Sequence, residues 1–127
     1  MDFLLMSSGF SYQKINRLLS RNDFDNLRVG SRRLKADFFT IFYKPNFLMS
    51  DSSRMGVSVS KKVGKAVFRN KLKRISRETF RTHGIVKNGI DFLIVFHPGI
   101  DQLGKDIIVQ NLQKAFSKLV QIKQSFS

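Results

Sequence analysis

Residues 60–81 constrain the fold of this chain more than any other segment, because they combine dense positive charge with a helical apolar period. The segment reads SKKVGKAVFRNKLKRISRETFR and carries nine basic side chains against one acid, Glu78. Its apolar residues recur at steps of three to five, as on one face of an α-helix; they are Phe68, Leu72, Ile75 and Phe80. The basic side chains fall on another face. The segment therefore predicts a helix that packs one side on a core and presents the other to a polyanion.

The charge of the whole chain also points to a polyanionic partner. The 127 residues carry a net charge of +14, so RNA, DNA or an acidic membrane face is expected as a ligand. No apolar run is long enough to span a membrane, and we expect no membrane partner. The chain has no cysteine, which excludes thiolate metal sites and suits a reducing cytosol. We expect a flexible segment at 1–14, one domain at 15–123 and a loose tail at 124–127.

Local patterns predict an alternation of helices and strands. Helices are expected at about 21–29, 67–83 and 103–123, and strands at 36–44, 55–62 and 91–97. Arg32, Arg33 and Lys35 are interpreted as a basic loop, and residues 45–54 as a turn region. The order α-β-β-α-β-α predicts one sheet with helices packed on it. If the two strands around the basic helix pair in parallel, that helix is a crossover, which is right-handed by default.

The strand expected at 55–62 has one face of small residues, namely Gly56, Ser58 and Ser60. Such a face is either an ordinary solvent-facing side of the strand or a place that leaves room for a ligand. The strand alone does not decide between these two readings.

Catalytic groups are scarce. Among the nine acids only Asp23 and Asp25 stand at a DxD spacing, no ExxH or HExxH spacing occurs, and no nucleotide-binding glycine loop is present. His83 and His97 lack a carboxylate nearby in the sequence, so both are expected to be structural. The sequence is thus rich in groups that bind anions and poor in groups that cut phosphodiesters.

The central segment resembles the signature of the bacterial ribonuclease P protein component. Residues 58–81 contain the R-N-x-x-K-R-x-x-R core of that family; its members here are Arg69, Asn70, Lys73, Arg74 and Arg77. The strand before it, 56–62, matches as well. The resemblance extends less densely over residues 15–123, through NRLLSRNDF upstream and the acid-led apolar strand at 91–96 downstream.

The resemblance implies a function. In that family the protein is the small subunit of a ribonucleoprotein endonuclease whose RNA subunit carries the catalytic site. The enzyme removes the 5′ leader of precursor tRNA by hydrolysis, with Mg²⁺ held mainly by RNA. The expected partners are therefore the RNA subunit and precursor tRNA, with no obligate protein partner and no metal site on this chain. A cytoplasmic location is expected.

The resemblance also implies a fold. The family is an α+β, two-layer α-β sandwich of order α-β-β-β-α-β-α, with a left-handed crossover around the signature helix. It therefore requires a third strand before that helix, which we place between residues 45 and 54 or nearby.

The resemblance also implies roles for individual residues, at the positions that match the family signature. Contacts to the RNA subunit are implied for Lys65, Arg69, Asn70, Lys73, Arg74 and Arg77. Contacts to the leader, in a cleft between the first helix and the sheet, are implied for Phe24, Arg28, Phe42, Ser58, Ser60, Lys61 and Lys62. Three positions depart from the family pattern: Leu27 or Arg28 stands where a second aromatic is common, Lys65 replaces an asparagine, and His97 replaces an arginine.

Two other functions compete with this hypothesis. A non-enzymatic RNA-binding protein of similar fold would not need the compact signature directly after SVSKK. A protein-only nuclease would need a carboxylate cluster. The sequence favours an RNA-binding subunit of a ribozyme-based endonuclease over both.

Overall fold

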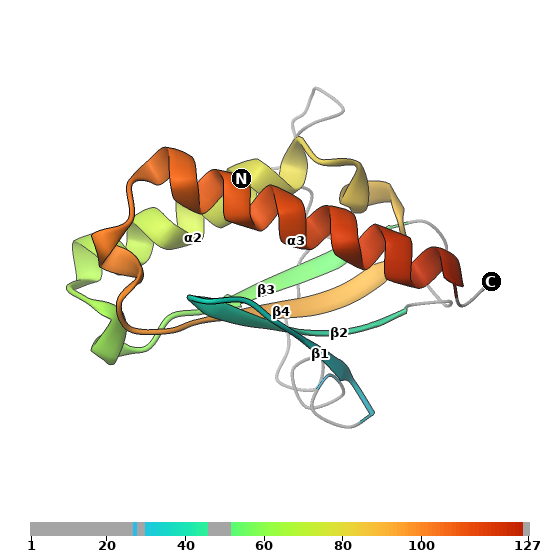
Figure 1. The fold of residues 1–127 in the computed structure, drawn as a ribbon, viewed down its shortest axis with the longest axis horizontal. Coiled ribbons are helices and arrows are strands. Elements are labelled where there is room, and N and C mark those ends of the chain that lie inside the picture. The colour runs from blue at the N-terminus through green and yellow to red at the C-terminus, as the bar shows by residue number, and fades with distance from the viewer. Residues whose placement is uncertain (1–26, 28–29, 46–51, 126–127) are drawn as a thin grey trace.

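The computed structural model describes residues 27, 30–45 and 52–125 of the chain. Its elements are β1 (Arg32–Lys35), β2 (Phe39–Pro45), β3 (Arg54–Ser58), α2 (Ala66–Arg81), β4 (Ile90–Phe96) and α3 (Lys105–Ser125), with short 3₁₀ helices η3 (Lys61–Val63), η4 (Gly84–Lys87) and η5 (Ile100–Gln102) (Figure 1). None of the described helices is long and apolar enough to cross a membrane.

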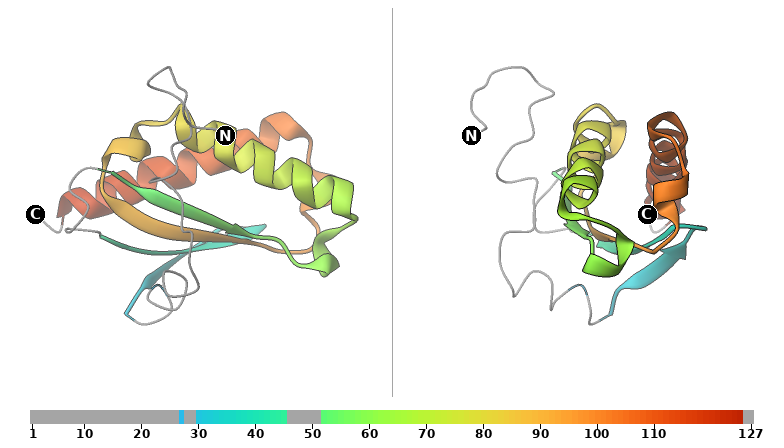
Figure 2. Two further views of the ribbon diagram at one scale, coloured as in Figure 1. Left: turned by 180° about the vertical axis from the view of Figure 1, so that it is seen from behind. Right: turned by 90° about the vertical axis from the view of Figure 1, so that its left-hand side faces the viewer.

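The four strands form one mixed sheet in the order β1-β2-β4-β3. The pairs β1–β2 and β2–β4 are antiparallel, whereas β3 and β4 are parallel neighbours joined through α2. Both long helices lie on the same face of the sheet, α2 over the β3 side and α3 over the β1–β2 side (Figure 2). The expected two-layer α+β sandwich is confirmed. The handedness of the crossover stays an expectation from the resemblance.

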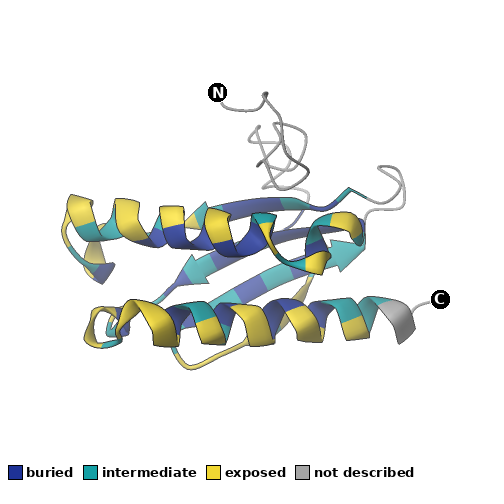
Figure 3. Cartoon of the chain, turned by 90° about the horizontal axis from the view of Figure 1, so that it is seen from above, coloured by how far each residue is buried: buried dark blue, intermediate teal, exposed yellow. Residues whose placement is uncertain are grey.

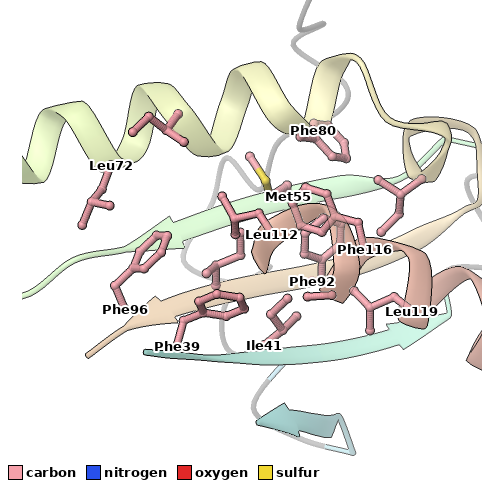
Figure 4. Close-up of a cluster of buried hydrophobic side chains, with 14 of the residues drawn as sticks. Phe39, Ile41, Met55, Leu72, Phe80, Phe92, Phe96, Leu112, Phe116 and Leu119 are labelled. Carbon is pink, nitrogen blue, oxygen red and sulfur yellow. The ribbon is translucent and has the colours of Figure 1, made fainter. Parts of the chain in front are cut away.

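The core fills the space between the sheet and the helices (Figure 4). Alternation along β2 buries Phe39, Ile41 and Tyr43 on the helix side. The continuous apolar run of β4 adds Phe92, whose ring centroid lies 5.7 Å from Phe80 of α2 and 5.4 Å from Phe116 of α3. Phe92 thus joins both helices to the centre of the sheet.

The apolar stripe predicted for the basic helix is confirmed. Leu72, Ile75 and Phe80 are buried, and Phe68 packs partly buried against the same core. Ser76 also lies on the buried side, which its hydroxyl tolerates because it donates to the carbonyl of Leu72 one turn back (2.8 Å). Figure 3 shows the resulting division of α2 into a buried and an exposed side.

The structure contains a third strand before α2, but this strand does not lie between residues 45 and 54, where the sequence predicts it. It is β1, which the sequence reading interpreted as a basic loop, while the interval 45–54 contributes only the end of β2 and the start of β3, with 46–51 outside the described residues. Three of the four residues of β1 are cationic, so the segment lacks the apolar alternation of a typical strand. Charged residues are tolerated there because β1 is an edge strand.

Two element boundaries also differ from the expectation. β3 ends at Ser58 and not at residue 62, because Lys61–Val63 turns into a 3₁₀ helix that buries Val63. α3 continues to Ser125. Ile107 of α3 is 45% exposed, and the buried face of the helix starts one residue later, at Ile108.

Candidate nucleic-acid interface

The exposed side of α2 is a row of cationic and amide groups. Asn70, Arg74 and Arg77 are exposed at steps of four and three, so they share one face, and Lys73 beside them is partly buried. We call these four residues the α2 face. Because the opposite side of the helix is fixed in the core, the α2 face is held rigidly toward solvent.

Arg69 is placed differently from the rest of the signature. Its side chain is half-buried, and its Nε donates to the carbonyl of Gly64 (3.1 Å). That bond uses one of five guanidinium N–H groups. Arg69 therefore braces the turn that leads into α2 and still has donors for an anion.

This turn concentrates positive charge at the start of α2. Lys61, Lys62 and Lys65 are exposed, while Val63 between them is buried as an anchor. Lys65 is the N-cap residue, no side chain caps the helix, and its first turn has no acid. Uncapped backbone N–H groups and the positive end of the helix dipole both favour an anion here.

The second candidate surface is the face of the sheet that the helices leave uncovered, here called the open face. Strand register places Arg33, Phe42, Leu93 and Gly56 in one row across all four strands. Phe42 is half-buried, and the guanidinium carbon of Arg33 lies 5.3 Å from its ring centroid. This geometry is a cation–π contact, so one side of the ring is already occupied.

A neighbouring row of the open face contains Lys35, Thr40, Val95 and Ser58. His97, two residues beyond Val95, shares a hydrogen bond with Thr40 (Nε2 to Oγ1, 2.9 Å). Sequence reasoning found neither this pair nor Arg33. The pairing register that brings them together is set by long-range contacts, and no local motif indicates it.

One end of the open face is fixed by an ion pair. Arg54 donates from Nε to Oδ1 of Asp91 (3.1 Å) and from Nη2 to Oδ2 (2.7 Å). These residues face each other in the parallel ladder of β3 and β4, and Asp91 is only 6% exposed. The two-point geometry gives Asp91 a structural role at the start of β4.

The structure brings some of the expected leader-contact residues together and not others. Phe42 and Ser58 lie on the open face. Ser60 lies beyond the end of β3, where its carbonyl accepts from the N–H of Val63 (3.1 Å), so it belongs to the turn before α2 and not to the strand expected at 55–62. Phe24 and Arg28 lie outside the described residues. Leu27, between them, is helical and 1% exposed.

His83 has a structural environment. Its Nδ1 accepts from the backbone N–H of Ile85 (3.0 Å), its Nε2 lies 3.1 Å from Oγ of Ser117, and its ring meets Phe116 edge to face. Burial lowers the pKa of His83 below 6.5 because the charged ring is poorly solvated. The ring is therefore held neutral and ties η4 to α3.

The acids and histidines of the described residues are dispersed. Within residues 27, 30–45 and 52–125, no three histidine, aspartate or glutamate side chains gather closely enough to hold a cation. Asp91 is already taken by Arg54, and Glu78 stands among the cations of α2. These residues do not fit a bound Mg²⁺.

Comparison with known proteins agrees with this architecture. The model of the family described as ribonuclease P matches residues 12–120. The chain is 37% identical over 109 residues to the ribonuclease P protein component of Citrifermentans bemidjiense, covering 86% of this chain and 92% of that protein. It is 32% identical over 121 residues to the component of Chromobacterium violaceum, covering 94% and 98%.

Solved structures show the same fold. The RNase P protein from Thermotoga maritima superposes with a TM-score of 0.71 at 29% identity, covering 80% of this chain and 96% of that one. The RNase P protein of Staphylococcus aureus gives 0.68 at 26% identity, covering 88% and 98%. The family model spans the sheet, α2 with the basic signature and most of α3, and from this we conclude that the chain belongs to the ribonuclease P protein family.

Proposed function

We propose that this chain is the protein subunit of a ribonucleoprotein endonuclease that removes the 5′ leader of precursor tRNA in the cytoplasm. The observation that supports this most is the presence of two different surfaces on one rigid domain. The α2 face and the lysines before it offer cationic donors, whereas the open face offers an aromatic ring and small polar side chains. A protein that joins two RNAs needs both.

In this proposal the α2 face binds the catalytic RNA. Arg74 and Arg77 can each donate two hydrogen bonds to a phosphate, which orients the RNA as well as attracting it. Asn70 adds a hydrogen-bond donor without charge, so its contact with the RNA depends less on salt concentration. Arg69 and Lys65 extend the contact to the turn before α2, where the helix dipole favours phosphate.

The open face then binds the leader of precursor tRNA. Phe42 stacks with a base on the side of its ring that Arg33 leaves free, which requires no particular sequence. Lys61, Lys62, Ser58 and Ser60 contact the leader backbone where it leaves the sheet. Precursor is preferred over mature tRNA because only the precursor makes these contacts.

The chain contributes binding and positioning, and the RNA contributes the chemistry. The cationic surfaces reduce repulsion between two polyanions and release their counterions on association. Mg²⁺, which the proposal leaves to the RNA subunit, supplies charge neutralisation and an activated water. No step of the hydrolysis is assigned to a group on this protein.

Reconstitution tests the proposal. The purified chain is mixed with a bacterial ribonuclease P RNA and 5′-labelled precursor tRNA at low Mg²⁺ and moderate salt, conditions in which the RNA alone is slow. We expect the chain to restore cleavage at the mature 5′ end. Cleavage by the chain without the RNA would contradict the division of roles, and failure to stimulate any bacterial RNA subunit would contradict the function.

A further inference from the structure

A hollow of about 240 Å³ lies between the turn from β1 to β2 and the middle of α3. Its lining comes from both elements: Leu34, Lys35, Ala36, Asp37, Phe38 and Phe39 from the strands and turn, and Asn111, Lys114, Ala115 and Lys118 from the helix. The turn is held in shape by a hydrogen bond from the N–H of Ala36 to the carbonyl of Phe39 (2.9 Å).

The hollow is positively charged. Lys35, Lys114 and Lys118 outnumber its one acid, Asp37, and all four side chains are exposed. Across the described part of the chain, no carboxylate lies within 4.0 Å of these three ammonium groups. Lys114 and Lys118 stand one turn apart on α3, where like charges repel and destabilise the helix. An anion in the hollow would remove this repulsion.

A second hollow adjoins the first along α3. Its lining is polar throughout: Gln110, Gln113, Lys114, Ser117, Lys118 and Gln121. Lys114 and Lys118 line both hollows and so stand between them. A nucleic-acid strand with a phosphate beside these two lysines would meet amide and hydroxyl groups on one side. On the other side it would meet the turn from β1 to β2, which carries Lys35.

The site is centred on α3 and on the turn from β1 to β2, and of its residues only Lys35 belongs by register to the open face. It lies beside β1, at the opposite edge of the sheet from β3, where α2 is packed (Figure 2). Three strand spacings separate the two edges, about 14 Å. None of the residues assigned to the α2 face or to leader binding lines either hollow.

We propose that Lys35, Lys114, Lys118 and Asn111 form a third RNA contact, which binds a backbone phosphate of an RNA strand running along α3. The charge and the amide donors suit a phosphodiester. The volume falls below the roughly 300–1,000 Å³ of sites that enclose whole small ligands, so a single phosphate and its sugar fit better than a free cofactor. The contact attaches the RNA to the domain beside β1 and α3, at a distance from the α2 face.

A cross-link from inside the hollow tests the proposal. Because the chain has no cysteine, Ala36→Cys provides one attachment point for a thiol-linked photo-cross-linker in the full chain. The probe is a bacterial ribonuclease P RNA, bound to the labelled protein and irradiated. We expect a cross-link to a discrete RNA segment, and we expect Lys114→Gln with Lys118→Gln in the same background to remove most of it.

The matched control is Lys87→Gln with Lys105→Gln, which removes equal charge from exposed lysines outside both hollows and should keep the cross-link. Circular dichroism confirms that each variant is folded. No cross-link with the unaltered lysines, or equal yields in both double variants, would overturn the proposal. Millimolar inorganic phosphate that abolishes the cross-link at fixed ionic strength would show a site for the free ion and would overturn the assignment to RNA.

The readout does not depend on cleavage. A lysine-dependent cross-link with an RNA that the chain fails to activate would refute the proposed function and leave the third contact standing. Restored 5′ processing without the cross-link would support the proposed function and refute the third contact.

Discussion

Replacing Arg74 and Arg77 together by glutamine should weaken the dependence of RNA binding on salt by a calculable amount. Both side chains are exposed on the α2 face, and the described structure shows no ion pair for either. Each can therefore neutralise one RNA phosphate. For helical RNA we take the duplex value of about 0.9 in the slope of log K against log[salt] per phosphate contact. The double variant should lose about 1.8 from the slope.

The assay is equilibrium binding to a ribonuclease P RNA at several salt concentrations. Between 50 and 200 mM salt, a slope smaller by about 1.8 means that the variant loses about twelvefold less affinity than the unaltered chain. Lys87→Gln with Lys105→Gln carries the same change in net charge and is the control, because neither lysine lies on the α2 face. Equal slopes for the two double variants would refute the reasoning, since binding would then follow net charge and not the α2 face.

Three further predictions concern the scaffold. Asp91→Asn should lower the free energy of unfolding by about 1–3 kcal/mol in urea titrations, because Arg54 loses a charged partner that it binds at two points. An unchanged free energy would show that the ion pair is solvated and does not contribute to stability. Leu72→Ala should cost about 2–5 kcal/mol in the same titration, since Leu72 is fully buried. Stability should fall as the pH drops below 6.5 and level off below the lowered pKa of His83, because the unfolded chain binds the proton more readily. His83→Asn, which can still accept from Ile85, should remove that part of the pH dependence.

The sequence predicted those parts of the fold that depend on local periodicity. The apolar stripe of α2 follows from spacing alone, because side chains on one face of a helix repeat every 3.6 residues. The exposure of Asn70, Arg74 and Arg77 follows from the same count.

The features that the sequence did not predict depend on residues far away in the chain. β1 is a strand because β2 offers it a hydrogen-bonding edge, and its own residues give no sign of that. The contact of Arg33 with Phe42 depends on the register between those strands, and the bond of Thr40 to His97 depends on a pairing across 57 residues. The hollow lined by Lys35, Lys114 and Lys118 forms only when the fold places the turn from β1 to β2 beside α3, so no linear motif could indicate it.

The most direct test of the two-surface account crosses two variants with two measurements. Arg74→Ala and Phe42→Ala are each assayed for affinity to the RNA subunit and for the preference of the holoenzyme for precursor over mature tRNA. Phe42→Ala should reduce the preference about fivefold, corresponding to about 1 kcal/mol, the low end for base stacking, because Arg33 occupies one side of the ring. Its affinity for the RNA subunit should not change.

Arg74→Ala should show the opposite pattern, with weaker binding to the RNA subunit and an unchanged preference once the complex is saturated. Phe42→Leu, which keeps apolar volume without a ring face, should behave like the alanine variant and separates stacking from packing. The account predicts two effects on two separate measurements. Equal effects of Arg74→Ala and Phe42→Ala on both would contradict it.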